Sequence, residues 1–96
     1  MERRHSGLLS KVTPKRLLIV DDDRALARAL ARAFSGLEVT TSGDGQEAIA
    51  LVNAGNWYDV ILTDVMMPAM RGDQLFLSLA DSAPLQAKRV VFMSGG

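Results

Sequence analysis

The sequence contains no cysteine, which excludes disulfide bonds, thiolate catalysis and cysteine-ligated zinc. No apolar run approaches the ~18 residues that a membrane-spanning helix needs, and no apolar segment follows the N-terminal charges as it would in a signal peptide. Eleven basic and eleven acidic residues leave no net charge, so no overall field attracts the chain to nucleic acid or to an anionic membrane. These absences favour a cytoplasmic protein without direct nucleic-acid or membrane binding, and the length of 96 residues favours a single domain.

The first residues differ from the rest of the chain. Residues 1–14 show no hydrophobic periodicity, and we expect them to form a flexible, basic N-terminal extension to a domain at residues 15–96. The first sixteen residues contain one acid, Glu2, and five basic residues, namely Arg3, Arg4, Lys11, Lys15 and Arg16. A solvated tail accounts for this charge, and an electrostatic contact with a partner is the alternative.

Short aliphatic runs alternate with helical patterns over the rest of the sequence. A continuous aliphatic run that ends at acidic residues, such as LLIV before Asp21, is typical of a strand buried on both faces, and VILT before Asp64 is a similar apolar run. Strands are predicted at residues 17–20, 37–41, 60–63 and 89–93. Helices are predicted between them, at residues 24–34, 46–52 and 72–80. Alternation of this kind indicates an α/β fold, in which an open parallel sheet carries helices on both faces.

The first predicted helix has two stripes at a spacing of four residues. The apolar stripe consists of Leu26, Leu30 and Phe34, and it is expected to face the sheet. The second stripe consists of Arg24, Arg28 and Arg32, and it is expected to form a solvated face.

Acidic residues follow two of the predicted strands. Asp21, Asp22 and Asp23 end the first strand, and Asp64 ends the third. If these strands are neighbours, the carboxylates meet, and two charges ~4 Å apart repel by about 4 kcal/mol at an effective dielectric of 20. A cation or raised pKa values would relieve this repulsion, and carboxylate oxygens suit Mg²⁺. Helix capping by an aspartate and a simple loop acid are the alternatives.

Three segments resemble the CheY-like receiver domains of bacterial response regulators. LLIVDDD at 17–23 is similar to the first strand and acidic pocket of that family, and ILTDVMMPAMRG at 61–72 is similar to its phosphoacceptor segment. VVFMSG at 90–95 is similar to the fourth strand with its terminal hydroxyl residue. The resemblance implies a flavodoxin-like sheet of order 2-1-3-4.

The family resemblance also implies a role for each matching residue. Asp64 matches the phosphorylated aspartate, and Asp21, Asp22, Asp64 and the backbone carbonyl of Met66 match the Mg²⁺ site. Ser94 matches the hydroxyl that turns toward the phosphoryl group, and Asp23 is expected only to cap the helix. The implied partner is a histidine kinase or phosphotransfer protein, and the implied chemistry is self-phosphorylation, without a separate substrate.

The resemblance ends after the fourth strand. The family continues with a helix, a fifth strand that carries a lysine near the phosphoryl group, and a last helix, and no residue of this chain matches them. The fourth strand is therefore expected to be an exposed apolar edge. We expect a fragment of a longer regulator, completion by another polypeptide, or a homodimer in which a second copy covers this edge.

Two other functions fit parts of the pattern. A protein-interaction or dimerisation module of receiver fold would keep the acidic pocket without being phosphorylated. A phosphohydrolase of the haloacid-dehalogenase type also uses a strand-end aspartate with Mg²⁺, but it needs a second acid two residues later, where this chain has Met66.

Overall fold

A four-stranded, all-parallel sheet of order β2-β1-β3-β4 forms the middle layer of the fold. The structure is a computed structural model, and it describes residues 15–93. The strands are β1 (Arg16–Val20), β2 (Glu38–Ser42), β3 (Val60–Asp64) and β4 (Val90–Met93). The helices are α2 (Arg24–Ala33), α3 (Gly45–Asn53), α4 (Gly72–Ser82) and the short α5 (Pro84–Ala87). The predicted α/β class and the order 2-1-3-4 are confirmed.

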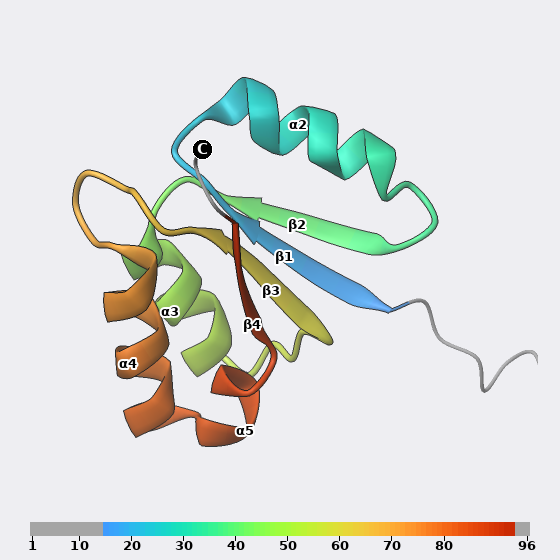
Figure 1. Ribbon diagram of the computed structural model, residues 1–96. Helices are drawn as coiled ribbons and strands as arrows, with labels where there is room; N and C mark the ends of the chain where they lie inside the picture. The colour runs from blue at the N-terminus through green and yellow to red at the C-terminus, as the bar shows by residue number, and fades with distance from the viewer. Residues whose placement is uncertain (1–14, 94–96) are drawn as a thin grey trace, which may run out of the picture.

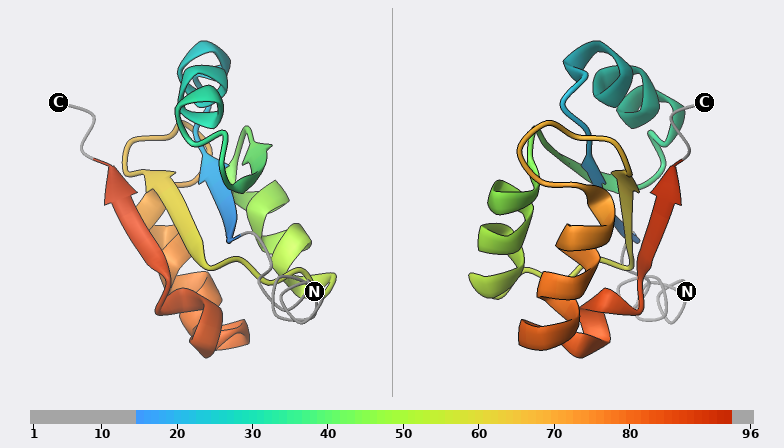
Figure 2. Two further views of the ribbon diagram at one scale, coloured as in Figure 1. Left: turned by 90° about the vertical axis from the view of Figure 1, so that its right-hand side faces the viewer. Right: turned by 60° about the vertical axis from the view of Figure 1, so that its left-hand side comes forward.

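The helices lie on both faces of the sheet (Figures 1 and 2). On the α3 and α4 side, the main core gathers around Leu18 and Ile61 from the two central strands and Leu75 and Leu79 from α4, all with no exposed surface. On the other side, α2 covers a smaller cluster that contains Leu17 and Ile19 of β1. β1 is therefore buried on both faces, which explains why its LLIV run has no polar residue.

The predicted apolar face of the first helix is wrong in part. Ala27 is the buried residue of α2 and Leu30 packs partly on the sheet, whereas Leu26 and Phe34 are 44% and 39% exposed. The reason is that α2 covers only part of its face of the sheet. Phe34 lines a groove together with Val60 and Leu62 of β3, where no described helix packs.

The edge strand β4 is exposed, as the sequence predicts. Val91 and Phe92 are 49% and 44% exposed, although Phe92 also makes an edge-to-face contact with Phe76 of α4. β4 pairs only with β3 among the described strands, so its outer backbone groups are available to another strand. Whether a second copy or a further segment occupies this edge stays a prediction. The expected extension at residues 1–14 lies outside the described residues.

The short helix α5 begins at Pro84 and carries a buried glutamine. Gln86 is 2% exposed, and its side-chain amide both donates to the carbonyl of Tyr58 and accepts from the backbone N–H of Tyr58, at 2.8 Å each. These two hydrogen bonds tie α5 to the segment that leads into β3. A proline in the first turn of a helix is compatible with helix geometry, because the missing N–H is not needed there.

Gln86→Leu is expected to destabilise the fold by about 2–6 kcal/mol, since it leaves a buried N–H and a buried carbonyl of Tyr58 unpaired at about 1–3 kcal/mol each. Urea denaturation followed by circular dichroism measures this loss. Gln46→Leu, at an exposed position of α3, is the matched control, with a change within about 0.5 kcal/mol. Equal denaturation midpoints for the two variants would contradict the role given to Gln86.

Candidate functional site

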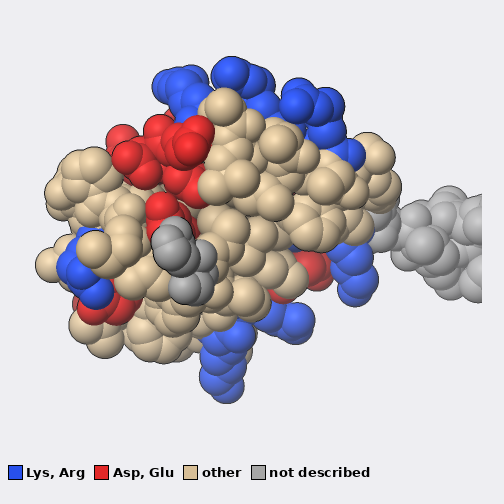
Figure 3. All heavy atoms as spheres, turned by 45° about the horizontal axis from the view of Figure 1, so that its top comes forward, with Lys and Arg blue, Asp and Glu red and all other residues tan. Residues whose placement is uncertain are grey.

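Carboxylates of two neighbouring strands converge at the carboxyl end of the sheet. β1 pairs with β3 in a register that places Val20 beside Thr63, so the next residues, Asp21 and Asp64, follow side by side. Asp21, Asp22 and Asp64 each present a carboxylate oxygen, and these oxygens all lie within 4.8 Å of one another. Figure 3 shows acidic side chains gathered on the surface beside the basic side chains that lie over α2.

Asp21 is the buried member of the cluster. It is 2% exposed, and its backbone N–H donates to the carbonyl of Ser42 at the end of β2. Burial raises the pKa of Asp21 above its ordinary value, the backbone N–H of Asp23 opposes the rise, and the nearby carboxylates of Asp64, Asp22 and Asp23 add to it. The cluster is therefore under electrostatic repulsion that a bound cation would relieve.

Asp23 has a structural role. Its side chain accepts from the backbone N–H of Leu26 at 3.0 Å and so caps the N-terminus of α2. Its own backbone N–H donates to Oδ1 of Asp21 at 2.8 Å, which fixes the orientation of that buried carboxylate. The expectation that Asp23 is only the helix cap therefore holds for its side chain, whereas its backbone also supports the site.

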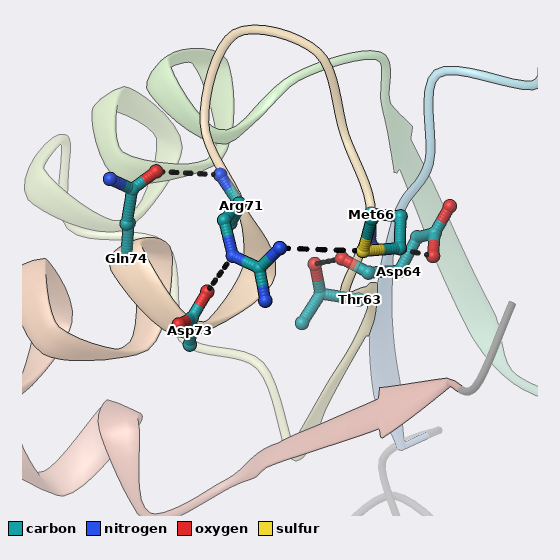
Figure 4. A network of polar contacts seen from close by, with 6 residues as sticks. All are labelled: Thr63, Asp64, Met66, Arg71, Asp73 and Gln74. Carbon is teal, nitrogen blue, oxygen red and sulfur yellow. Dashed lines mark hydrogen bonds and ion pairs between the residues drawn. The ribbon is translucent and has the colours of Figure 1, made fainter.

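Asp64 is half-buried at the end of β3 and is held from within its own loop. Its Oδ1 accepts from the backbone N–H of Met66 at 3.1 Å, and its backbone carbonyl accepts from the hydroxyl of Thr63 at 3.1 Å (Figure 4). Among residues 15–93, Oδ2 of Asp64 accepts no hydrogen bond. One carboxylate oxygen is thus fixed, and the other is left for a ligand or for nucleophilic attack.

The loop after Asp64 returns to its starting point before α4 begins. The backbone N–H of Gly72 donates to the carbonyl of Val65 at 2.9 Å. A Cβ atom at Gly72 would lie 2.6 Å from the carbonyl oxygen of Asp64, which is closer than such atoms approach. Glycine is therefore required here by the close contact of two backbone segments.

Arg71 also belongs to the surroundings of Asp64. Its Nη1 donates to the sulfur of Met66 at 3.4 Å and its Nε donates to Asp73 at 3.0 Å, so the guanidinium lies across the loop on the Asp64 side (Figure 4). The sequence showed a cation just before Gly72, but it gave no indication that the side chain turns back toward Met66.

The other predicted site residues have different outcomes. Met66 lies two residues after Asp64 with its side chain 62% exposed, and its backbone carbonyl remains a predicted ligand. Ser94 lies outside the described residues, so its role stays a prediction. It follows Met93, which pairs with Asp64 in the sheet.

Comparison with known proteins identifies the family. The family model of the response regulator receiver domain matches residues 17–96. The chain belongs to the response regulator receiver domain family. Receiver domains are regulatory parts of two-component systems, and their partners in general are histidine kinases.

None of the helices between residues 15 and 93 has the length and apolarity that crossing a bilayer demands.

Individual receiver proteins show the same likeness. Response regulator MprA of a Mycobacterium species (strain KMS) is 46% identical over 61 residues, which cover 62% of this chain and 26% of the relative. A response regulator receiver protein of Anaeromyxobacter is 40% identical over 79 residues, which cover 80% of this chain and 33% of the relative. The chain therefore spans about a quarter to a third of these curated relatives.

Solved receiver structures show the same fold. The receiver domain of the Francisella response regulator 1452 has a TM-score of 0.75 and 34% identity, and the match covers 85% of this chain and 66% of that one. TrrA of Thermotoga maritima, a response regulator solved in complex with Mg²⁺ and BeF, has a TM-score of 0.67 and 28% identity, covering 81% of this chain and 65% of that one. These likenesses support the receiver fold of the described residues.

Proposed function

We propose that this receiver accepts a phosphoryl group on Asp64 from the phosphohistidine of a histidine kinase or phosphotransfer protein, in a reaction that needs Mg²⁺. The observation that carries the proposal is the convergence of Asp21, Asp22 and Asp64, with carboxylate oxygens within 4.8 Å of one another. A purely structural role does not explain three carboxylates so close together. Their mutual repulsion lowers the stability of the fold unless a cation is bound.

The donor set fits Mg²⁺. This ion is bound by hard oxygen ligands, keeps several of its waters, and uses one or two carboxylates together with phosphate. Asp22 and Asp64, with the carbonyl of Met66, are proposed as direct ligands, and the buried Asp21 is proposed to act through water. When bound, Mg²⁺ would neutralise the negative charge that an incoming phosphoryl group brings to the acidic cluster.

The proposed step uses Oδ2 of Asp64, which accepts no hydrogen bond among residues 15–93. Its Oδ2 attacks the phosphorus, the new O–P bond forms, and the bond from phosphorus to the histidine nitrogen breaks with its electron pair left on the imidazole. The Met66 N–H keeps Oδ1 in place, so the attacking oxygen has a fixed direction. Ser94 is proposed to turn toward the phosphoryl group afterwards and to start a shift between two surface states. The chain then serves as a regulatory acceptor, without a separate substrate.

Acetyl phosphate provides the direct test of this function. With Mg²⁺, the intact protein is expected to gain the mass of one phosphoryl group, and EDTA is expected to prevent the gain. Mapping by borohydride reduction and peptide mass spectrometry is expected to locate the group at Asp64. No gain at saturating acetyl phosphate and Mg²⁺ would contradict the proposal and favour an interaction module of receiver fold, for which the exposed strand β4 offers a surface.

A further inference from the structure

The acidic site needs more positive charge once it is phosphorylated. An aspartyl phosphate carries about two negative charges, and Asp21 and Asp22 remain beside it. One Mg²⁺ therefore leaves the site with an excess of about two negative charges when all groups are ionised. A second cation that contacts the phosphoryl oxygens would lower the free energy of the phosphorylated state.

We infer that Arg71 adds positive charge to the phosphorylated site, and that its guanidinium binds the phosphoryl group on Asp64. The inference rests on the proposed function, because it needs a phosphoryl group at that position. Arg71 is the basic residue whose side chain is hydrogen-bonded into the loop that begins at Asp64, through the sulfur of Met66. The planar guanidinium presents paired N–H donors that match the oxygens of a phosphoryl group.

The backbone of the loop places Arg71 close to the acceptor. Gly72, its neighbour, has its backbone against the backbone of Asp64, since a Cβ atom there would meet the Asp64 carbonyl oxygen at 2.6 Å. The Met66 residue whose sulfur holds Nη1 of Arg71 also donates its backbone N–H to the Asp64 carboxylate. The guanidinium and the carboxylate are thus separated by one residue that contacts both (Figure 4).

The present partners of Arg71 are weak ones. A thioether sulfur is a poor hydrogen-bond acceptor. The ion pair with Asp73 is on the surface, where the two side chains are 48% and 56% exposed, and such pairs contribute little to stability. A doubly charged phosphoryl group is a much stronger acceptor than the Met66 sulfur, so the side chain is expected to exchange the sulfur for it.

The helix cap at residue 71 does not depend on the arginine side chain. The backbone N–H of Arg71 donates to the side chain of Gln74 at 2.8 Å, and a guanidinium has no acceptor with which to cap the free N–H groups of α4. A substitution at this position therefore removes the charge and keeps the cap. Arg24 and Arg28 are the nearby alternatives, but they line a pocket on the other side of the cluster, beside Asp21 and Glu47.

The test measures two affinities of the full chain, one for Mg²⁺ alone and one for beryllofluoride in saturating Mg²⁺, by calorimetry. Beryllofluoride occupies the position of the phosphoryl group on a carboxylate. Arg71→Ala is expected to weaken beryllofluoride binding by about 5–20-fold, in line with the loss of a half-exposed, charge-assisted hydrogen bond. Its affinity for Mg²⁺ alone is expected to stay the same or to rise, because a positive charge near the cation is removed.

Three further variants separate charge from structure. Arg71→Lys is expected to recover part of the beryllofluoride affinity, since it keeps the charge without the planar fork. Asp73→Asn is expected to strengthen binding, because it frees Arg71 from its ion pair. Arg32→Ala, which removes an exposed arginine at the end of α2, is the matched control and is expected to change neither affinity.

The outcomes distinguish failure of the inference from failure of the proposed function. If the unaltered chain binds beryllofluoride and Arg71→Ala binds it equally well, Arg71 does not bind the phosphoryl group. If Arg71→Ala weakens Mg²⁺ and beryllofluoride alike, the residue only supports the loop and the inference is overturned. If the unaltered chain binds no beryllofluoride in Mg²⁺, the proposed function fails first.

Discussion

Asp64→Asn is expected to abolish the mass gain produced by acetyl phosphate and Mg²⁺. The substitution replaces the attacking carboxylate oxygen with a neutral amide, which is not a nucleophile under these conditions, and nearly conserves the shape of the side chain. It also removes one of three mutually repelling charges, so the variant is expected to remain folded and to be slightly more stable without Mg²⁺. Intact-mass spectrometry measures the first effect, and thermal denaturation measures the second.

Asp81→Asn is the matched control for this experiment. Asp81 is exposed near the end of α4, away from the carboxyl edge of the sheet. The substitution is therefore expected to leave the mass gain from phosphorylation unchanged. A gain that persists in Asp64→Asn would mean that another residue accepts the phosphoryl group. The assignment of Asp64 would then be wrong, even if Mg²⁺ still binds.

Gly72→Ala is expected to disturb both the fold and the site. The added Cβ atom would lie 2.6 Å from the carbonyl oxygen of Asp64 and 3.1 Å from Cα of Val65, and these are backbone atoms that cannot rotate away. Overpacking of this kind costs about 1–3 kcal/mol, offset in part by the better helix propensity of alanine. Because the displaced atom belongs to Asp64, the affinity for Mg²⁺ and the rate of phosphorylation are expected to fall together.

Gly43→Ala provides the comparison for this prediction. Gly43 precedes α3, and a Cβ atom there would meet nothing within 4 Å. Urea denaturation is expected to give an unchanged or slightly higher stability for Gly43→Ala and a lower one for Gly72→Ala. If the two variants were equally stable and equally active, the close contact between Gly72 and Asp64 would not hold in solution.

Much of the fold is predictable from sequence because the strands are unusually clear. The runs LLIV and VIL contain only aliphatic residues, and the central strands β1 and β3 contribute residues to the clusters on both faces of the sheet. The alternation of such runs with helical patterns leaves few topologies open. The order of the strands came from the family resemblance, since the pattern alone does not fix which strands are neighbours.

The wrong predictions for α2 and α5 arose because tertiary packing around a helix is not visible in its own sequence. Spacing alone places Leu26, Leu30 and Phe34 on one helical stripe, but the buried direction of α2 depends on how much of the sheet it covers. Phe34 lies over the part of the face that no described helix covers, so it stays 39% exposed. The four-residue helix α5 was missed because a segment so short has no periodicity to detect, and Gln86 gave no sign of its buried role.

The candidate site was predictable only for residues whose positions are fixed by the pairing of strands. Strand-end acids converge once β1 and β3 are neighbours, so the meeting of Asp21, Asp22 and Asp64 could be expected from position alone. The direction of a long side chain on a loop is set by weak contacts such as that between Arg71 and the Met66 sulfur, and these are not encoded in spacing. The roles of Met66 and Ser94 stay predictions.

Titration of the isotopically labelled protein with Mg²⁺, followed by amide NMR, tests the central claim most directly. Saturable shifts centred on residues 21–23 and 64–66 are expected, and Asp22→Asn is expected to weaken the binding strongly while leaving the rest of the spectrum intact. The contradicting result would be a spectrum that does not change with Mg²⁺ in the millimolar range, or shifts of equal size in Asp22→Asn. The acids at the carboxyl edge would then be a cluster without a cation, and Asp64 would lack the environment that phosphorylation requires.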